Sequence, residues 1–243
     1  MSSPGSLAAV TAVALALIAP ARADDRPAID APVEAAGLTV DDVARTQCTA
    51  YLVRPLSDQI LAEVACLRPG VLAPIDDIPG VELGANASPL LNAAAAKALR
   101  AAADGSALWI FSTTRTVAQQ YVYHAWYRHK QCRSVVSLAA PPGRSNHESG
   151  LAIDVPSYGA WRARLHARGY RWLGRSDVVH FDYRGRGKVD LRRLGVRAFQ
   201  RLWNRNHPDD RIREHGRWDT ATARRMAKAP AGGFAIGPSC EQR

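Results

Sequence analysis

Short stretches with helical hydrophobic spacing follow one another along this chain, interrupted by short stretches of apolar and β-branched residues. Apolar residues three and four positions apart mark one face of a helix, whereas alternation marks a strand. The predicted helices are one that follows Thr39 and those at 57–66, 88–103, 116–130, 161–168, 194–203 and 220–228. The predicted strands are 108–113, 151–155 and 178–183, and the Pro- and Gly-containing segment 69–87 is interpreted as loop with a short strand. This order predicts an α+β fold with a small, mainly antiparallel sheet flanked by helices.

Residues that favour helix termini mark where three of these helices begin. Thr39 can cap the first helix, and Asp41 and Asp42 suit the positive end of its dipole. Ser57 can cap the second helix. Ser88 followed by proline is typical of the start of the third, because proline is favoured at the first helical position.

The N-terminus has the pattern of an export signal. Residues 7–18 are apolar and rich in alanine, and residues 21–23 (Ala-Arg-Ala) fit the small-x-small site of a signal peptidase. The apolar run is short for a membrane anchor. No lysine or arginine precedes it, so a hydrophobic helix of the fold is the alternative. We expect a signal peptide at 1–23, a flexible leader at 24–37, and export to the periplasm or the cell exterior without a stable membrane anchor.

The chain has four cysteines, namely Cys48, Cys66, Cys132 and Cys240. None is paired as Cys-x-x-Cys, which argues against a thiolate zinc site or a redox motif. An even number in an exported chain predicts two disulfides, with buried free thiols as the alternative. We expect Cys48–Cys66 and Cys132–Cys240, because the first pair would join two neighbouring N-terminal helices.

Composition and charge narrow the class of protein. Hydrophobic residues make up 47% of the 243 residues, which excludes wholesale disorder. The formal net charge of +10 suits a protein drawn to anionic polymers such as cell wall, although genome composition explains an arginine excess equally well. The charges are scattered and no nucleic-acid-binding motif is present, so we expect no nucleic-acid partner. We expect a monomer.

Two histidines and an aspartate are the candidate metal ligands. His147 and Asp154 lie in the string Ser-Asn-His-Glu-Ser-Gly-Leu-Ala-Ile-Asp, and His180 follows in Asp-Val-Val-His. Two imidazoles and one carboxylate make a tetrahedral zinc site with one position left open for water. The His-Glu pair at 147–148 does not begin an HExxH zinc helix, because Leu151 stands where the second histidine would be.

The string S-x-H-x-x-G-x-A-x-D, followed by a late histidine with an acid three residues before it, resembles the zinc D-alanyl-D-alanine carboxypeptidase (VanY-like) family. That family includes phage L-alanyl-D-glutamate endolysins. The resemblance covers about residues 85–185 and implies a zinc peptidase that cuts peptidoglycan stem peptides, on a fold core shared with hedgehog signalling proteins. It implies that His147, Asp154 and His180 hold Zn²⁺.

The same resemblance implies roles for other residues. Asp177 would be the general base for the water that zinc activates. Arg115 and Gln120 match the family's R-S-x-x-x-Q turn, and Arg115 would bind the scissile carbonyl or a substrate carboxylate. Ser145 would be a supporting polar group. Asp182 would orient a zinc-ligating imidazole, unless it is a surface residue.

Two departures from the family pattern concern bond specificity. Many carboxypeptidase members have glutamate where this chain has Asp177, and tryptophan where it has Val179. D-alanyl-D-alanine carboxypeptidase is the leading interpretation and L-alanyl-D-glutamate endopeptidase the alternative. A non-catalytic, zinc-containing wall-binding protein is the alternative of another class.

The pattern of strands ends near residue 190, which predicts a peptidase domain at 38–190 and a helical appendage at 191–243. Within the appendage, 196–202 and 215–222 resemble parts of the three-helix peptidoglycan-binding repeat, with differences at its glycines. The alternative is a helical hairpin that packs on the peptidase domain.

Overall fold

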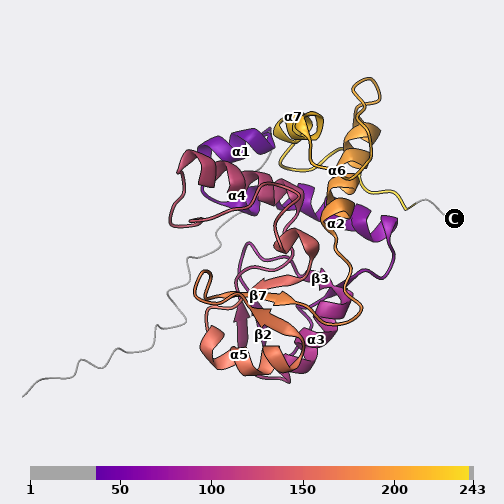
Figure 1. The fold of residues 1–243 in the computed structure, drawn as a ribbon. Coiled ribbons are helices and arrows are strands. Elements are labelled where there is room, and N and C mark those ends of the chain that lie inside the picture. Colours follow the sequence, from indigo (N-terminus) through magenta and orange to yellow (C-terminus); the bar gives the residue numbers. More distant parts are fainter. Residues whose placement is uncertain (1–36, 241–243) are drawn as a thin grey trace, which may run out of the picture. The chain divides into compact units, whose positions relative to one another are not determined.

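This computed structural model describes residues 37–240 (Figure 1). These residues contain seven α-helices and seven short strands. Two 3₁₀ turns, η2 and η3, are interspersed. In chain order the elements are α1 (Val40–Thr46), η2 (Ala50–Val53), α2 (Arg54–Leu67), β1 (Leu72–Pro74), β2 (Val81–Leu83), β3 (Leu90–Asn92), α3 (Ala93–Ala103), β4 (Leu108–Ile110), α4 (Val117–His129), η3 (His147–Ser149), β5 (Ala152–Asp154), α5 (Tyr158–Ala167), β6 (Tyr170–Trp172), β7 (His180–Tyr183), α6 (Arg192–Asn206) and α7 (Thr220–Lys228).

The strands form three small sheets. The largest is antiparallel with the order β5-β7-β6, β1 pairs antiparallel with β3, and β2 pairs parallel with β4. An isolated bridge between Ser112 and Asp154 links the end of β4 to β5. The prediction of an α+β fold with a mainly antiparallel sheet is confirmed.

The third helix begins later than predicted. It starts at Ala93, and Asn92 caps it by accepting a hydrogen bond from the backbone N–H of Ala94. The residues just after Ser88 extend as β3, because they pair with β1. Tertiary pairing therefore overrides the helix-start signal of serine and proline.

The second helix begins earlier than predicted. It starts at Arg54, with Pro55 in its first turn, so Ser57 is not its cap. Ser57 is buried instead and its hydroxyl lies 2.8 Å from that of Thr116, which caps α4. Thr39 caps α1 as predicted, and Asp42 completes a capping box that was not predicted.

Buried apolar side chains form two cores. The helical core is built by α1, α2, α4, α6 and α7, and includes Leu56, Trp126 and Phe199. The sheet core lies among the strands, α3 and α5, and includes Ile153 and Phe181. Figure 1 shows the first group of helices gathered apart from the strands, α3 and α5.

The C-terminal helices pack on the N-terminal ones. Phe199 and Trp203 of α6 belong to the same core as Val43 of α1 and Leu56 of α2. From residue 37 to residue 240 the chain belongs to one compact unit. The helices of residues 191–243 thus share one core with α1 and α2.

The predicted disulfide pairing is wrong, although all four cysteines are in disulfides. Cys48 is bonded to Cys132, and Cys66 to Cys240. Cys48 and Cys132 follow α1 and α4, which pack side by side, whereas Cys66 ends α2, against which the C-terminal tail lies. Proximity therefore follows tertiary packing rather than nearness in sequence.

Among residues 37–240, no helix is long and apolar enough to cross a membrane. The predicted signal peptide and all of the predicted leader except Gly37 lie outside the described residues.

A buried ion-pair network holds the C-terminal tail. The carboxylate of Glu63 is completely buried and accepts hydrogen bonds from Arg201 at 2.6 Å, Arg205 at 3.2 Å and the backbone N–H of Ser239 at 3.0 Å. Burial raises the pKa of Glu63, but these hydrogen bonds outweigh it, and the pKa lies below its ordinary value of 4.5. The ionised carboxylate of Glu63 therefore stabilises the folded protein.

We predict that the two disulfides are Cys48–Cys132 and Cys66–Cys240 in the purified protein. Replacing Cys66 and Cys240 together with alanine should lower the free energy of unfolding by about 4–5 kcal/mol, because the bond closes a long loop. Peptide mapping under non-reducing conditions checks the pairing, and urea unfolding checks the stability. A peptide that joins Cys48 to Cys66 would contradict the assignment.

The Glu63→Gln variant should lose about 3 kcal/mol of stability at pH 7, because two arginines are left without their carboxylate. A lowered pKa means that the stabilisation is present above the unfolded value near 4.5 and is lost as pH falls through the folded value. The difference from wild type should therefore shrink as the pH falls below about 4.5. Urea unfolding from pH 3.5 to 8 measures it, with the exposed Asp58→Asn on the same helix as control. A difference that does not change with pH would exclude this explanation.

Candidate metal centre

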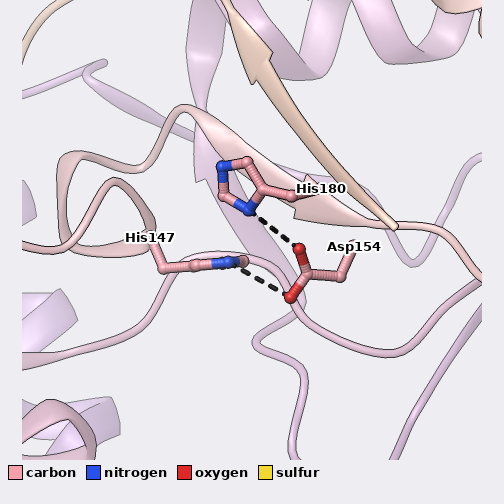
Figure 2. A group of neighbouring side chains, drawn as sticks. All are labelled: His147, Asp154 and His180. Carbon is pink, nitrogen blue, oxygen red and sulfur yellow. Dashed lines mark hydrogen bonds and ion pairs between the residues drawn. The ribbon is translucent and has the colours of Figure 1, made fainter. Parts of the chain in front are cut away.

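Three short elements bring the predicted metal ligands together. His147 lies in η3, Asp154 ends β5 and His180 begins β7. The antiparallel register of β5 and β7 places Asp154 directly opposite His180. Figure 2 shows both imidazoles turned toward the carboxylate, one toward each oxygen. The predicted set is thus assembled by one strand pair and one turn.

The separations in this cluster fit a metal ion. His147 Nε2 lies 3.2 Å from Asp154 Oδ2, and His180 Nδ1 lies 3.0 Å from Asp154 Oδ1. The three ligand atoms all lie within 4.8 Å of one another, and all three residues are buried. Ligands about 2.1 Å from a tetrahedral zinc are separated by about 3.4 Å, so little movement is required.

The tautomer of His147 is set by a backbone carbonyl. Its Nδ1 lies 2.7 Å from the carbonyl oxygen of Thr113, which can only accept, so Nδ1 carries the proton. Burial lowers the pKa of His147, so the imidazole is neutral. Its Nε2 lone pair therefore faces the Asp154 carboxylate, and two acceptors in contact call for a cation between them.

Asp182 orients the other imidazole. It is buried, and its Oδ1 lies 3.1 Å from His180 Nε2, while its Oδ2 accepts from Asn146 and Arg184. Burial lowers the pKa of His180, but hydrogen bonds to Asp154 and Asp182 raise it to about 9. At that pKa the ring carries a proton on both nitrogens when no metal is bound, so a metal ion at Nδ1 would displace one proton while Asp182 keeps the other on Nε2.

Asp154 remains ionised in this environment. Burial raises its pKa, but the charges and hydrogen bonds of His147 and His180 outweigh burial and hold the pKa well below its usual range. One carboxylate and two imidazoles, each oriented by a second partner, fit a divalent metal ion by ligand type as well as by distance.

Asp177 lies in the turn that leads into β7, and its backbone carbonyl accepts from the N–H of His180. The side chain is half-buried. Burial raises the pKa of Asp177 and the charge of Asp154 raises it further, whereas the histidines lower it. Its carboxylate therefore interacts electrostatically with the cluster without being one of the three grouped ligands.

Arg115 reaches the cluster from the turn before α4. Its backbone N–H donates to the carbonyl of His147, and its guanidinium donates to Gln120 Oε1 at 3.0 Å and to Ser112 Oγ at 3.1 Å. Gln120 is completely buried and donates to the carbonyl of Ala140, so it braces Arg115.

Ser145 supports the turn that carries His147. Its hydroxyl accepts from the backbone N–H of His147 at 3.3 Å. Glu148, which was not predicted as part of the site, accepts from the N–H groups of Gly143 and Ser145. Burial raises the pKa of Glu148 to about 7, although these hydrogen bonds oppose it. Its carboxylate binds the loop and is not among the grouped metal ligands.

Sequence reasoning also missed Ser112, Thr113 and Asn146. Ser112 lies between Arg115 and His147, because its hydroxyl is 3.3 Å from His147 Nδ1. Thr113 acts through its backbone carbonyl, which no side-chain pattern reveals. Asn146 lies inside the histidine string, and only the fold places it against Asp182.

A comparison with protein-family models matches residues 88–177 to VanY, the D-alanyl-D-alanine carboxypeptidase. These residues are a VanY domain. The match contains Arg115, His147, Asp154 and Asp177 and ends three residues before His180, so the grouping of His180 with the two earlier residues rests on the sheet register. Comparisons with curated proteins and with solved structures gave no match.

Asp182→Asn should weaken metal binding by the cluster of His147, Asp154 and His180 about 10- to 100-fold, because the amide no longer fixes the His180 tautomer. His147→Ala should abolish tight binding. Competition with a chromogenic chelator for Zn²⁺ measures both, and the exposed Asp209→Asn is the matched control. Unchanged affinity in Asp182→Asn would mean that the contact with His180 has no part in metal binding.

Proposed function

We propose that this protein is a zinc-dependent D-alanyl-D-alanine carboxypeptidase that trims peptidoglycan stem peptides. The observation that carries the proposal is the buried cluster of His147, Asp154 and His180, of which the first two lie inside the match to VanY. Asp177 and Arg115 beside it are the acid–base and binding groups that a peptidase needs.

Zinc is the metal that we propose. Three nitrogen and oxygen ligands from the protein, with a fourth position for water, are typical of catalytic zinc sites. Zinc bound there would polarise the scissile carbonyl and lower the pKa of the attacking water to about 7.

Asp177 and Arg115 then provide proton transfer and substrate binding. The carboxylate of Asp177 accepts the proton of the attacking water and passes it to the leaving amine. Arg115 binds substrate oxygen, and its contacts with Gln120 and Ser112 fix its direction before substrate arrives.

The position of Arg115 favours the carboxypeptidase over the endopeptidase. The guanidinium of Arg115 contacts Ser112, and Ser112 lies next to Nδ1 of His147. The other ring nitrogen, Nε2, faces Asp154. The Arg115 guanidinium therefore lies beside the candidate metal ligands rather than among them. In that position it suits the binding of a terminal carboxylate, which is one residue away from the scissile carbonyl. The L-alanyl-D-glutamate endopeptidase remains the second candidate, because Val179 leaves room where the family has an aromatic residue.

We further propose that the protein works outside the cytoplasm, in the periplasm or beyond the cell. Both disulfides suit an oxidising compartment, and residues 1–23 have the pattern of a signal peptide.

The zinc-loaded protein should remove one terminal alanine from muropeptides that end in D-Ala-D-Ala, and a chelator should abolish the reaction. Asp177→Ala should lower kcat about 10²- to 10⁴-fold with zinc content unchanged, because only proton transfer is lost. Mass spectrometry of the products and metal analysis measure the two effects, with Asp209→Asn as control.

Other products would redirect the assignment. Cleavage between L-Ala and D-Glu would identify the endopeptidase. No product under zinc-replete conditions, together with saturable binding to cell wall, would identify the non-catalytic wall-binding protein.

A further inference from the structure

The side chain of Tyr123 lies against Arg115, although no sequence pattern singles it out. Tyr123 follows Gln120 by three residues on α4, so both side chains project from one face of the helix. The Cζ atom of Arg115 lies 4.4 Å from the centre of the Tyr123 ring, within the range of a cation–π contact. The ring also meets the buried Trp126 edge-on at 5.4 Å, so the helical core holds it in place.

Three neighbours hold the Arg115 guanidinium in one orientation, namely Tyr123, Gln120 and Ser112. The hydrogen bonds to Gln120 and Ser112 occupy two of its five N–H groups. A guanidinium that is fixed in advance loses little entropy on binding, and its remaining N–H groups can bind a carboxylate.

The hydroxyl of Tyr123 makes no hydrogen bond with another residue in the described part of the chain. A partly buried tyrosine hydroxyl usually has a partner. Burial raises the pKa of Tyr123, Arg115 lowers it and Asp154 raises it, so the hydroxyl keeps its proton at neutral pH and remains a donor. The charges of Arg115 and Asp154 both act on the pKa of this hydroxyl, and the ring that carries it lies 4.4 Å from the Arg115 guanidinium carbon.

We propose that Tyr123 is a substrate-binding residue whose ring supports Arg115 and whose hydroxyl donates a hydrogen bond to the free C-terminal carboxylate of the stem peptide. The inference rests on the proposed function and names the substrate group that this part of the site takes. A carboxylate has about four acceptor sites on two oxygens, enough for N–H groups of Arg115 and the hydroxyl of Tyr123 together. An internal or amidated carbonyl offers a single oxygen and no charge.

The test compares a stem pentapeptide that ends in D-Ala-D-Ala with the same peptide amidated at its C-terminus. Tyr123→Phe keeps the ring and removes the hydroxyl, whereas Tyr123→Leu removes both. Tyr127→Phe, one turn further along α4 and more exposed, is the matched control. Zinc content and thermal unfolding verify that each variant is folded and loaded.

Wild type should prefer the free acid. Tyr123→Phe should lower kcat/KM for the acid about tenfold, through KM more than kcat, and leave the amide within about twofold, because a hydrogen bond to a charged group is lost. Tyr123→Leu should lose more, about 100-fold, because Arg115 is also released. Tyr127→Phe should match wild type.

Equal kcat/KM for wild type and Tyr123→Phe on the acid would overturn the inference, and so would an equal loss on acid and amide. If wild type released no product from either peptide, the proposed function would fail. The inference would then be decided by calorimetric titration with the pentapeptide. About tenfold weaker binding by Tyr123→Phe would uphold it, and equal binding would overturn it.

Discussion

The lone pair of a neutral imidazole, His147, faces the ionised carboxylate of Asp154 at 3.2 Å, and the rest of the site is arranged around that contact. Two acceptors at this distance repel one another unless a cation lies between them. The carbonyl of Thr113 enforces the contact, because it accepts the hydrogen bond from the single N–H of the neutral ring. Gly150 lets the turn fold this tightly: its φ is +70°, and a Cβ there would lie 2.7 Å from a methyl group of Leu191.

The site lies where the helical core and the sheet core meet. The sheet core supplies Asp154 and His180 through one strand register, whereas α4 of the helical core brings Gln120 and Tyr123 to Arg115. The bond between Cys48 and Cys132 ties the two ends of the α1–α4 packing together. The contacts that position Arg115 thus depend on α4, a helix whose buried side chains belong to the helical core rather than to the sheet core.

Local chemistry in the sequence was enough to predict part of this fold. The cap at Thr39 was predicted, because a capping side chain bonds a backbone N–H only three residues away. The start of α3 could not be predicted in this way, because Leu90–Asn92 pair with β1 as strand β3. The bond between Cys66 and Cys240 was not predicted because it too depends on tertiary packing, which brings together cysteines 174 residues apart.

In the candidate site, the part that could be predicted is the part that is local in sequence. His147 and Asp154 are seven residues apart in one string, but the partners that set their protonation come from elsewhere, as the carbonyl of Thr113 shows. The contact between Tyr123 and Arg115 also lies outside that string, because helix α4 brings the ring to the guanidinium. Under the proposed function, a change at Tyr123 would alter substrate binding without replacing any of the three grouped residues. A string of ligands in such a sequence accordingly predicts the chemistry better than it predicts the substrate.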